Sequence, residues 1–426
     1  MNSRNRNRQF ATIIAVIAVA YVMSQFYRTS NGVIAKHLSW EFGLSAEALG
    51  VLTGAFFVSF AVAQIPLGML FDLFGVRRTL PILLTAAVAG AVIYASAGGF
   101  ASLIAGRLMM GVGVSGVLVG ALFLFGRWVP AERYATWIGR MIALGGIGVL
   151  LSTSPLGLIA ETIGWRYAFF GAGAITALGA LLIYLLARDA PPGYIAKSSA
   201  PEGLGESVKG VFEVLKTKRL PTVMAMAFAS YPVLTSILGL WGGPYLIDVH
   251  GLDIISSGNV LLLMAVALIA GNIVFGPVER ILNTRKWLVV GCAATVLVSF
   301  ALLALIPQLP LAAAVALVVL ISFFSAYNIV ITGHGRSLFP DRLAGRGMAM
   351  MAIALMGGPA VLQPATGLIM GAFPTVDGVA PNEAYRAVFA CLAGVVLLAL
   401  LLYLRLPDAR PSEGFAKDLR GSAPMP

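Results

Sequence analysis

The stretch GMLFDLFGVRR, residues 68–78, lies between two long apolar segments and gathers glycine and charge in a short space. Gly68 lacks a side chain and so permits close approach of a neighbouring helix. Asp72 carries a negative charge that can face a helix N-terminus, where negative charge is favoured. Gly75 suits a left-handed turn, and Arg77 and Arg78 follow it as a basic pair. The stretch therefore predicts a tight, charged loop between two membrane helices.

A second copy of this loop, GPVERILNTRK, occupies residues 276–286, which is 208 positions further along the chain. Asn283 replaces Gly75 there, and asparagine is among the few other residues that visit left-handed backbone readily. The acid moves to Glu279, and Arg280 stands where the first copy has Asp72. Other matches follow in the same order: GLSAEALGVL at Gly43 with GLDIISSGNV at Gly251, GGIGVLL at Gly145 with GGPAVLQ at Gly357, and Trp165-Arg166 with Tyr385-Arg386. The series predicts two homologous halves.

The composition indicates a membrane protein. Of the 426 residues, 59% are hydrophobic and 11% are charged, whereas soluble domains carry about 25% charged residues. A helix needs about 20 mostly apolar residues to cross the hydrocarbon core. The sequence therefore predicts an all-α membrane protein of about twelve transmembrane helices, in two six-helix pseudo-symmetric halves. The predicted spans are residues 10–36, 45–72, 79–98, 100–126, 134–160, 166–188, 221–247, 255–278, 287–307, 310–334, 345–372 and 385–404.

Changes in composition divide the chain into four predicted parts. A polar stretch rich in proline, glycine, serine and lysine, residues 189–220, is predicted to be a cytoplasmic linker. It separates an N-terminal six-helix bundle, residues 1–188, from a C-terminal six-helix bundle, residues 221–404. Residues 405–426 form a polar cytoplasmic tail. Within the linker, residues 207–218 are compatible with one short amphipathic helix.

The net charge of +11 is explained by topology rather than by nucleic-acid binding. When the N-terminus is placed in the cytoplasm, most lysines and arginines fall on cytoplasmic loops and tails, and only Lys36, Arg166 and Arg386 fall on outer loops. This asymmetry follows the positive-inside rule. It predicts a multi-pass protein of the bacterial inner membrane, or of an internal membrane derived from it, with both termini cytoplasmic. The expected partners are the lipid bilayer and a small-molecule substrate, not nucleic acid.

The loop at residues 68–78 resembles the G-x-L-x-D-x-x-G-x-R-R signature of the major facilitator superfamily (MFS), with Leu73 at a position that can be basic in other members. The resemblance implies a fold of six plus six helices and transport by alternating access. It also implies that the loops gate the inward-closed state and do not bind the substrate. We expect a monomer. The implied gating residues are Gly68, Asp72, Gly75, Arg77, Arg78, Glu279, Arg280, Arg285 and Lys286.

Two charged residues fall inside the predicted spans, Arg28 in the first and Arg107 in the fourth. Each lies about seven residues from the outer end of its span, so both are expected roughly 10 Å below the outer surface. Charge inside a membrane is costly and marks a functional site by default. No acid lies in the middle of a predicted span, so the two arginines should recruit a mobile anion, which a planar guanidinium can grip with two bonds. The alternative is that one or both snorkel to the interface or bond to backbone carbonyls.

The superfamily resemblance adds further candidates. In that fold the first, fourth, seventh and tenth helices line the central cavity, so other polar residues on these helices are candidates for binding the substrate, with ordinary packing as the alternative. They are Tyr27, Asn31, Tyr231, Thr235, Tyr327 and Asn328. The stretch RLMMGVG, residues 107–113, also resembles the R-x-x-x-G-x-G motif of the fourth helix, which implies a role for Arg107 in proton coupling.

These features predict a secondary active transporter, or permease, of a small anionic solute, with a proton as the candidate coupling ion. Iron or an iron chelate is an alternative cargo, because the stretch QFYRTSNGVIAKHL, residues 25–38, and the chain length resemble magnetosome-associated permeases of the superfamily. A non-transporting scaffold or sensor with the same fold is a second alternative. No enzyme activity, cofactor or metal site is expected, since the sequence shows neither a cluster of acids, histidines or nucleophiles nor a nucleotide-binding loop.

Overall fold

The structure, a computed structural model, describes residues 3–191, 213–214, 216–339, 343–376 and 378–412. Most of the predicted linker at 189–220, most of its helix at 207–218 and the tail beyond 412 lie outside the described residues. Within the described residues, twelve segments are long and apolar enough to cross a membrane, which confirms the predicted number of spans. The protein is therefore a multi-pass membrane protein. The spans are Arg8–Thr29, Ala46–Phe74, Val76–Ala95, Phe100–Trp128, Thr136–Thr162, Trp165–Leu186, Leu220–His250, Ile254–Ile281, Lys286–Leu305, Leu311–Ser337, Gly347–Gly371 and Asn382–Tyr403.

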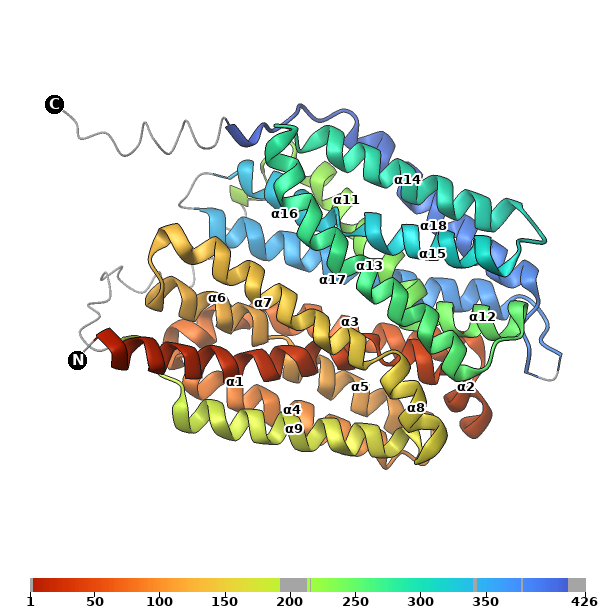
Figure 1. The fold of residues 1–426 in the computed structure, drawn as a ribbon, viewed down its shortest axis with the longest axis horizontal. Coiled ribbons are helices and arrows are strands. Elements are labelled where there is room, and N and C mark those ends of the chain that lie inside the picture. Colours follow the sequence, from red (N-terminus) through yellow and green to blue (C-terminus); the bar gives the residue numbers. More distant parts are fainter. Residues whose placement is uncertain (1–2, 192–212, 215, 340–342, 377, 413–426) are drawn as a thin grey trace. The chain divides into compact units, whose positions relative to one another are not determined.

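Several spans consist of more than one helix, as the labels in Figure 1 show. The helices of the first six spans are α1 (Ser3–Thr29), α2 (Asn31–Phe42), α3 (Ala46–Phe74), α4 (Val76–Ala95), α5 (Phe100–Val114), α6 (Val117–Trp128), α7 (Ala131–Leu151), α8 (Ser154–Thr162) and α9 (Trp165–Leu186). The helices of the last six spans are α11 (Leu220–Ser236), the π-helical turn η1 (Ile237–Trp241), α12 (Gly242–His250), α13 (Ile254–Ile281), α14 (Lys286–Leu305), α15 (Leu311–Ser325), α16 (Asn328–Ser337), α17 (Ala344–Gly371) and α18 (Asn382–Tyr403).

Helix α2 follows the first span after a break at Ser30, and we count it as the continuation of that span. On this count five of the described spans are interrupted, which releases backbone groups from the regular helical hydrogen bonds. The interruptions lie at Ser30, at residues 115–116, at residues 152–153, at η1 and at residues 326–327. The side chains of Ser115, Ser152 and Thr153 each donate to the carbonyl three residues earlier, at 2.7, 2.7 and 2.6 Å. Membrane helices tolerate breaks where such groups satisfy the backbone. The first, fourth, seventh and tenth spans, which the MFS resemblance places around a cavity, are all interrupted.

Contacts divide the chain into two compact units that differ from the two sequence halves. Unit 1 comprises Met1–Ser198, Ser236–Ala265 and Ala360–Pro381, and unit 2 comprises Ser199–Thr235, Val266–Pro359 and Asn382–Pro426. Unit 1 therefore holds the first six spans together with η1, α12, the first part of α13 and the last part of α17. We call the end of unit 1 at which α2 ends and α3 begins the far end. The division into two six-helix bundles stays a prediction.

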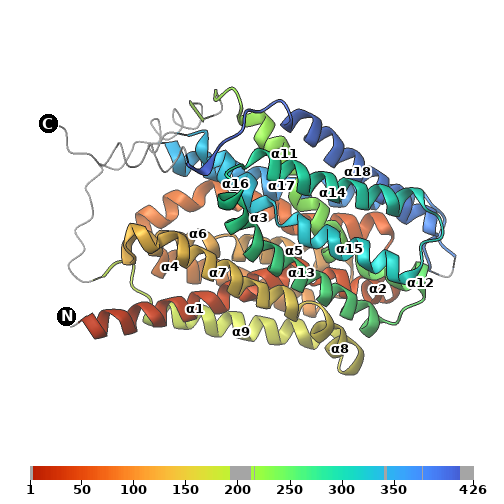
Figure 2. The ribbon, with the colours of Figure 1, turned by 45° about the horizontal axis from the view of Figure 1, so that its top comes forward.

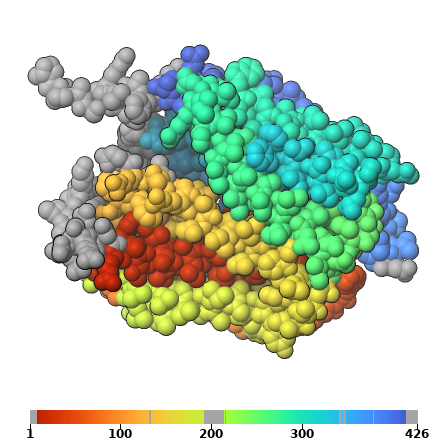
Figure 3. All heavy atoms as spheres, viewed as in Figure 1, coloured from red at the N-terminus to blue at the C-terminus, as the bar shows by residue number. Residues whose placement is uncertain are grey.

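Small residues set the packing inside unit 1. Helix α4 packs against α5 and α9, and α1 packs against α7 and α9, neighbours that both ribbon views show (Figures 1 and 2). A side chain at Gly90 of α4 or Gly106 of α5 would meet the backbone of the other helix, as is common where membrane helices approach closely. The outer face of α9 is apolar, with Leu178, Leu181 and Leu185 exposed. This face, yellow-green in Figure 3, suits contact with lipid.

Helix α4 is held at both ends, by an acid just beyond α9 and by an arginine in the first turn of α9. At the N-terminal end, Asp189 accepts a hydrogen bond from the backbone N–H of Arg77 at 3.0 Å. At the other end, Arg166 donates to the carbonyl of Ala97, just beyond α4, at 2.8 Å. An acid at the N-terminus and a cation at the C-terminus both match the helix dipole. We call this pair of contacts an end clamp.

Unit 2 repeats the end clamp on α14, using an acid just beyond α18 and an arginine near the start of α18. Asp408 accepts hydrogen bonds from the backbone N–H groups of Arg285 and Lys286, at 3.2 and 2.9 Å. Arg386 donates to the carbonyl of Ala304 at 2.7 Å. The two end clamps occupy equivalent places in the two sequence repeats, which agrees with the duplication that the sequence indicates.

The structure corrects the prediction that Lys36 lies on an outer loop. Helix α2 continues to Phe42, so Lys36 lies within a helix and is buried, with 7% of its surface exposed. Its charge is matched by Asp248, and a paired partner is what allows a lysine to be buried.

Candidate functional site

Arg107 of α5 is fully buried in unit 1. Its Nη1 donates a hydrogen bond to the carbonyl of Tyr27 at 2.7 Å. Its guanidinium lies over the rings of Phe56 and Tyr94, 5.0 and 6.0 Å from their centroids. Among the described residues, its Nε and Nη2 have no hydrogen-bond partner. Because unpaired buried charge is costly, Arg107 presents two donors that a further ligand would stabilise.

Arg28 of α1 lies over the ring of Phe60, 4.8 Å from its centroid, and is 8% exposed. Phe60 and Phe56 are four residues apart on α3, and their rings stack with centroids 6.2 Å apart. The two guanidinium groups therefore rest on two adjoining rings, each in a cation–π contact. Burial of both side chains disfavours the alternative that they snorkel to the membrane interface.

The contact between Arg107 and Tyr27 occurs at the interruption between α1 and α2. The carbonyl of Tyr27 also accepts a hydrogen bond from Ser30 Oγ at 3.3 Å. The alternative in which an arginine bonds to a backbone carbonyl is therefore observed for one nitrogen of Arg107. The arrangement links the fourth span mechanically to the break in the first.

The other two predicted site residues of unit 1 take part in buried polar contacts. Asn31 donates from Nδ2 to Thr53 Oγ1 at 2.9 Å and accepts from the hydroxyl of Tyr94 at 3.0 Å. The hydroxyl of Tyr27 lies 2.9 Å from that of Thr176 on α9. Arg28, Arg107, Tyr27 and Asn31 are thus brought together, but the two neutral residues already have partners from the protein. Their role in binding a substrate stays a prediction.

The remaining predicted site residues lie in unit 2, near the breaks of the seventh and tenth spans. Tyr327 is fully buried at the interruption between α15 and α16, and its hydroxyl has no partner among the described residues. Asn328 begins α16 and is half-buried. Thr235, on α11 next to η1, donates to the carbonyl of Tyr231 at 3.1 Å. Their contribution to a common site stays a prediction.

The loops at residues 68–78 and 276–286 both have positive φ where it was predicted, although Gly75, with a ψ of 168°, is not in the left-handed helical region. Gly75 has a φ of 74° and Asn283 a φ of 49°, and Asn283 is the one residue other than glycine with positive φ in the described chain. A side chain at position 75 would meet the carboxylate of Asp189. Glycine is therefore required there both by the backbone angle and by the end clamp of α4.

The other two residues of the first loop make fewer contacts. Asp72 is exposed at the end of α3. A Cβ at Gly68 would meet no atom of its unit within 4 Å, so the close helix approach expected at Gly68 is not made within its unit.

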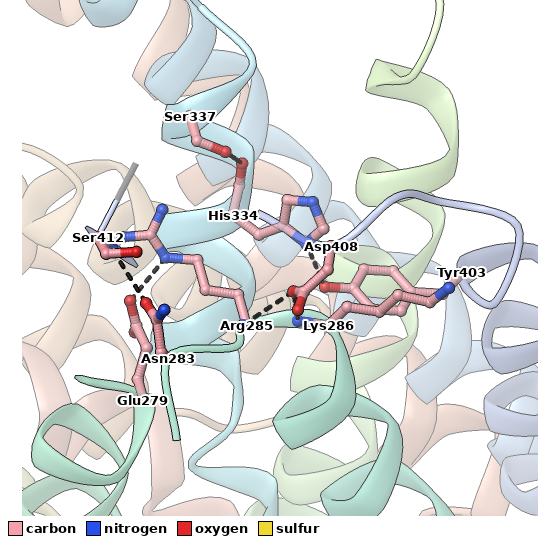
Figure 4. Close-up of polar contacts among 9 residues, drawn as sticks. All are labelled: Glu279, Asn283, Arg285, Lys286, His334, Ser337, Tyr403, Asp408 and Ser412. Atoms are coloured by element: carbon pink, nitrogen blue, oxygen red, sulfur yellow. Dashed lines mark hydrogen bonds and ion pairs between the residues drawn. The ribbon is translucent and has the colours of Figure 1, made fainter. Parts of the chain in front are cut away.

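The second loop forms a connected polar cluster in unit 2 (Figure 4). Arg285 Nε lies 2.6 Å from Glu279 Oε1, so the displaced acid of the second copy pairs with a basic residue of the same loop. Asn283 accepts a hydrogen bond from the N–H of Ser412 at 3.1 Å. Partial burial raises the pKa of Asp408, but hydrogen bonds from the Thr284 side chain and from the backbone at 285 and 286 outweigh it and hold that pKa below its ordinary value.

Several of these contacts were not among the predictions from the sequence. Asp189 and Asp408 each follow the last helix of a half, and alignment of the two repeats through to the ends of α9 and α18 would have found them as a pair. Phe56 and Phe60 carried no signal, since a phenylalanine pair on a membrane helix is ordinary. The described residues contain no group of three or more His, Cys, Asp or Glu that could hold a metal ion.

Comparison with known proteins agrees with this architecture. The family model of the Major Facilitator Superfamily matches residues 17–334. A hexuronate transporter of Bacillus subtilis is 26% identical over 306 residues, which are 68% of this chain and 72% of that protein. The nitrate/nitrite transporter NrtP of Picosynechococcus sp. is 30% identical over 227 residues, 46% of this chain and 42% of that one. A probable sulfoacetate transporter of Cupriavidus necator is 27% identical over 191 residues, 45% and 44% of the two chains.

Solved structures share the fold. A bacterial homologue of the human lysosomal transporter Spinster, in an inward-facing and unoccupied conformation, has a TM-score of 0.72 and 18% identity, with 95% of this chain and 99% of that chain covered. A D-xylose–proton symporter has a TM-score of 0.70 and 14% identity, with 93% and 98% covered. The names of these five proteins do not refer to iron, so the iron alternative gains no support from them.

Proposed function

Because the chain belongs to the Major Facilitator Superfamily and is a membrane transporter, we propose that it moves a small anionic solute by alternating access, with Arg28 and Arg107 as the contacts of the anion. The observation that carries the proposal is the fully buried guanidinium of Arg107, with two donors that lack a partner among the described residues. A bound carboxylate, sulfonate or nitrate could accept from both.

The chemistry of the site favours an anion over a neutral solute. Two cations lie close to the same aromatic pair, Phe56 and Phe60, and the spans that hold the cations have no acid in their middle. Charge-assisted bonds from arginine to an oxyanion are short and strong, and the planar fork can make two at once. The named cargoes of the relatives, hexuronate, nitrate or nitrite, and sulfoacetate, are all anions. These names support the same class of substrate for this chain.

Uptake into proteoliposomes tests the proposal. The panel would contain D-glucuronate, nitrate, sulfoacetate and tartrate as anions, D-xylose as a neutral solute and ferric citrate as an iron chelate, each with and without a pH gradient. We expect uptake of at least one of the four anions, competition by the others, and no uptake of xylose. Xylose transport without anion transport would overturn the proposal, and uptake of ferric citrate alone would favour the iron alternative. Dependence on the pH gradient would identify the proton as the coupling ion.

The distribution of Lys and Arg supports an inner-membrane orientation with both termini in the cytoplasm, which puts the far end of unit 1 outside. Single cysteines at Ala200 and His250, in a background without Cys292 and Cys391, should react with membrane-impermeant maleimide from opposite sides. In intact cells we expect labelling at position 250 but not at position 200. Labelling of both positions from the same side would contradict the orientation and the twelve-span topology.

We propose that the loop at residues 68–78 gates the cytoplasmic side and that Asp72 contributes by facing a helix N-terminus in the inward-closed state. Asp72→Asn should then slow turnover about threefold to tenfold, because a helix-dipole contact contributes about 1 kcal/mol, with little change in KM. The matched control is Asp253→Asn, which alters an acid that accepts a bond from the N–H of Ser256 at 2.7 Å, outside both gating loops. Wild-type turnover in Asp72→Asn would contradict a gating role for Asp72 and would leave the loop only a role in membrane topology.

A further inference from the structure

Lys36 and Asp248 form a buried ion pair at the far end of unit 1. The Nζ of Lys36 lies 2.5 Å from Oδ1 and 2.7 Å from Oδ2 of Asp248, and it also donates to the carbonyl of Gly378 at 3.0 Å. Asp248 accepts a further bond from the N–H of Ala380 at 3.2 Å. Its side chain is 2% exposed. The carboxylate is thus enclosed by an ammonium group and a backbone donor, as a bound carboxylate would be.

The pair joins segments from opposite halves of the sequence. Lys36 lies on α2 of the first span, and Asp248 lies near the end of α12 in the seventh, 212 residues away. Their segments touch through glycine, since a Cβ at Gly32 of α2 would meet the carbonyl of Leu238 in η1, and one at Gly243 of α12 would meet the carbonyl of Gly32. If the far end opens during transport, α12 must leave α2 and the pair must separate.

A buried ion pair contributes little net free energy to holding two helices together. Desolvation of two charges offsets most of their attraction, and apolar residues of similar volume hold a buried contact at least as well. What distinguishes the ion pair is its response to opening, because each separated charge becomes hydrated and can seek a new partner. In the open state the ammonium group of Lys36 can therefore bind an anion, which an apolar residue could not do.

We propose that Lys36 is an outer contact for the transported anion and that Asp248 takes the place of that anion when the far end closes. Lys36 lies eight residues beyond Arg28 along the first span, which is about 12 Å at the rise of a helix. With the far end open, the ammonium group receives the oxyanion. On closing, the carboxylate of Asp248 replaces it, and the anion passes inward to Arg28 and Arg107. This inference rests on the proposed function, since it assigns a second contact to the same substrate.

The exchange of the anion for Asp248 at Lys36 favours movement of the anion inward. An ammonium group left exposed above the anion would hold it back at the outer mouth, whereas pairing with Asp248 cancels that attraction at the moment of closure. Each step replaces one oxyanion at Lys36 by another, so no proton needs to move.

The first experiment measures closure without any substrate. Ser257 is 2% exposed and donates to the carbonyl of Gly243 at 3.3 Å, so Ser257→Cys is a near-isosteric reporter beside α12. In a background without Cys292 and Cys391, Asp248→Asn should raise the rate of labelling by impermeant maleimide at least tenfold, because the charge of Lys36 would be left buried without its counterion. An unchanged rate would show that the pair does not hold the far end closed and would overturn the proposal.

The second experiment separates anion binding from closure. Lys36→Met/Asp248→Leu removes both charges and keeps an apolar contact, so labelling should stay within threefold of wild type. Uptake into intact cells would be measured with whichever panel anion wild type takes up fastest. We expect the double variant to raise KM about tenfold, since one charge-assisted bond is lost, while Asp248→Asn should lower KM because its carboxylate no longer competes with the anion for Lys36. Lys36→Gln/Asp248→Asn provides the same comparison if the apolar variant does not reach the membrane.

Wild-type KM in the double variant would overturn the outer contact, even if the labelling result stood. If wild type takes up none of the panel anions, the proposed function fails, and the anion role of Lys36 fails with it. In that case labelling of the Ser257→Cys reporter still decides whether the pair holds the far end closed, so the two failures are distinguishable.

Discussion

Arg107→Met is expected to weaken binding of the transported anion about tenfold to a hundredfold, because a hydrogen bond to a charged group contributes about 1.5–3 kcal/mol. The variant removes the two donors that face no partner in the described chain, and it also withdraws the Nη1 bond from the carbonyl of Tyr27. Arg107→Lys should recover little, since an ammonium group cannot reproduce the planar fork. Isothermal titration with the panel anion that wild type transports would measure the loss.

A matched control and a double variant make this prediction specific. Arg127→Met removes another arginine of the fourth span, whose guanidinium lies 4.0 Å from the ring centroid of Phe123, and it should leave affinity near wild type. Arg28→Met/Arg107→Met should lose less than the sum of the single variants, because both residues are proposed to hold one ligand. If Arg107 serves proton coupling instead, its variants will keep their affinity and lose only transport driven by a pH gradient.

Gly32→Val is expected to reduce uptake about thirtyfold or more by preventing closure of the far end. A Cβ at position 32 would collide with the carbonyl of Leu238, and a backbone obstacle cannot rotate away as a side chain can. Overpacking costs about 1–3 kcal/mol even in cores that can adjust, and here it would act on one conformation only. The Ser257→Cys reporter should therefore label rapidly, and wild-type affinity for the anion should remain in the open form.

The same substitution at an open position controls for a general effect of valine in a membrane helix. A Cβ at Gly171 of α9 meets no atom within 4 Å, so Gly171→Val should leave uptake and labelling close to wild type. Slow reporter labelling in Gly32→Val would contradict the prediction, because it would mean that α2 and η1 adjust to the valine without separating.

The sequence was sufficient for features that depend on local composition. Twelve apolar segments, two copies of the loop and the left-handed backbone at Asn283 are all properties of short stretches, and the structure confirms them. The burial of Lys36 could not be predicted, because its partner Asp248 is 212 residues away. The position of the Arg107 guanidinium over the rings of Phe56 and Tyr94 could not be predicted either, because the three residues belong to three different spans. Charge and hydropathy indicated which residues were unusual, but only packing shows what each one touches.

The end clamps of α4 and α14 bear on how such a machine can move. In each clamp an arginine of the neighbouring span binds one end of a helix, and an acid that follows the same span binds the other end. Sliding the neighbour by one helical turn, about 5.4 Å, would part both grips together. The hydrogen bonds at both ends therefore keep α9 from sliding along α4, and α18 from sliding along α14. Each of these two helix pairs is therefore expected to move as a single body during a conformational change.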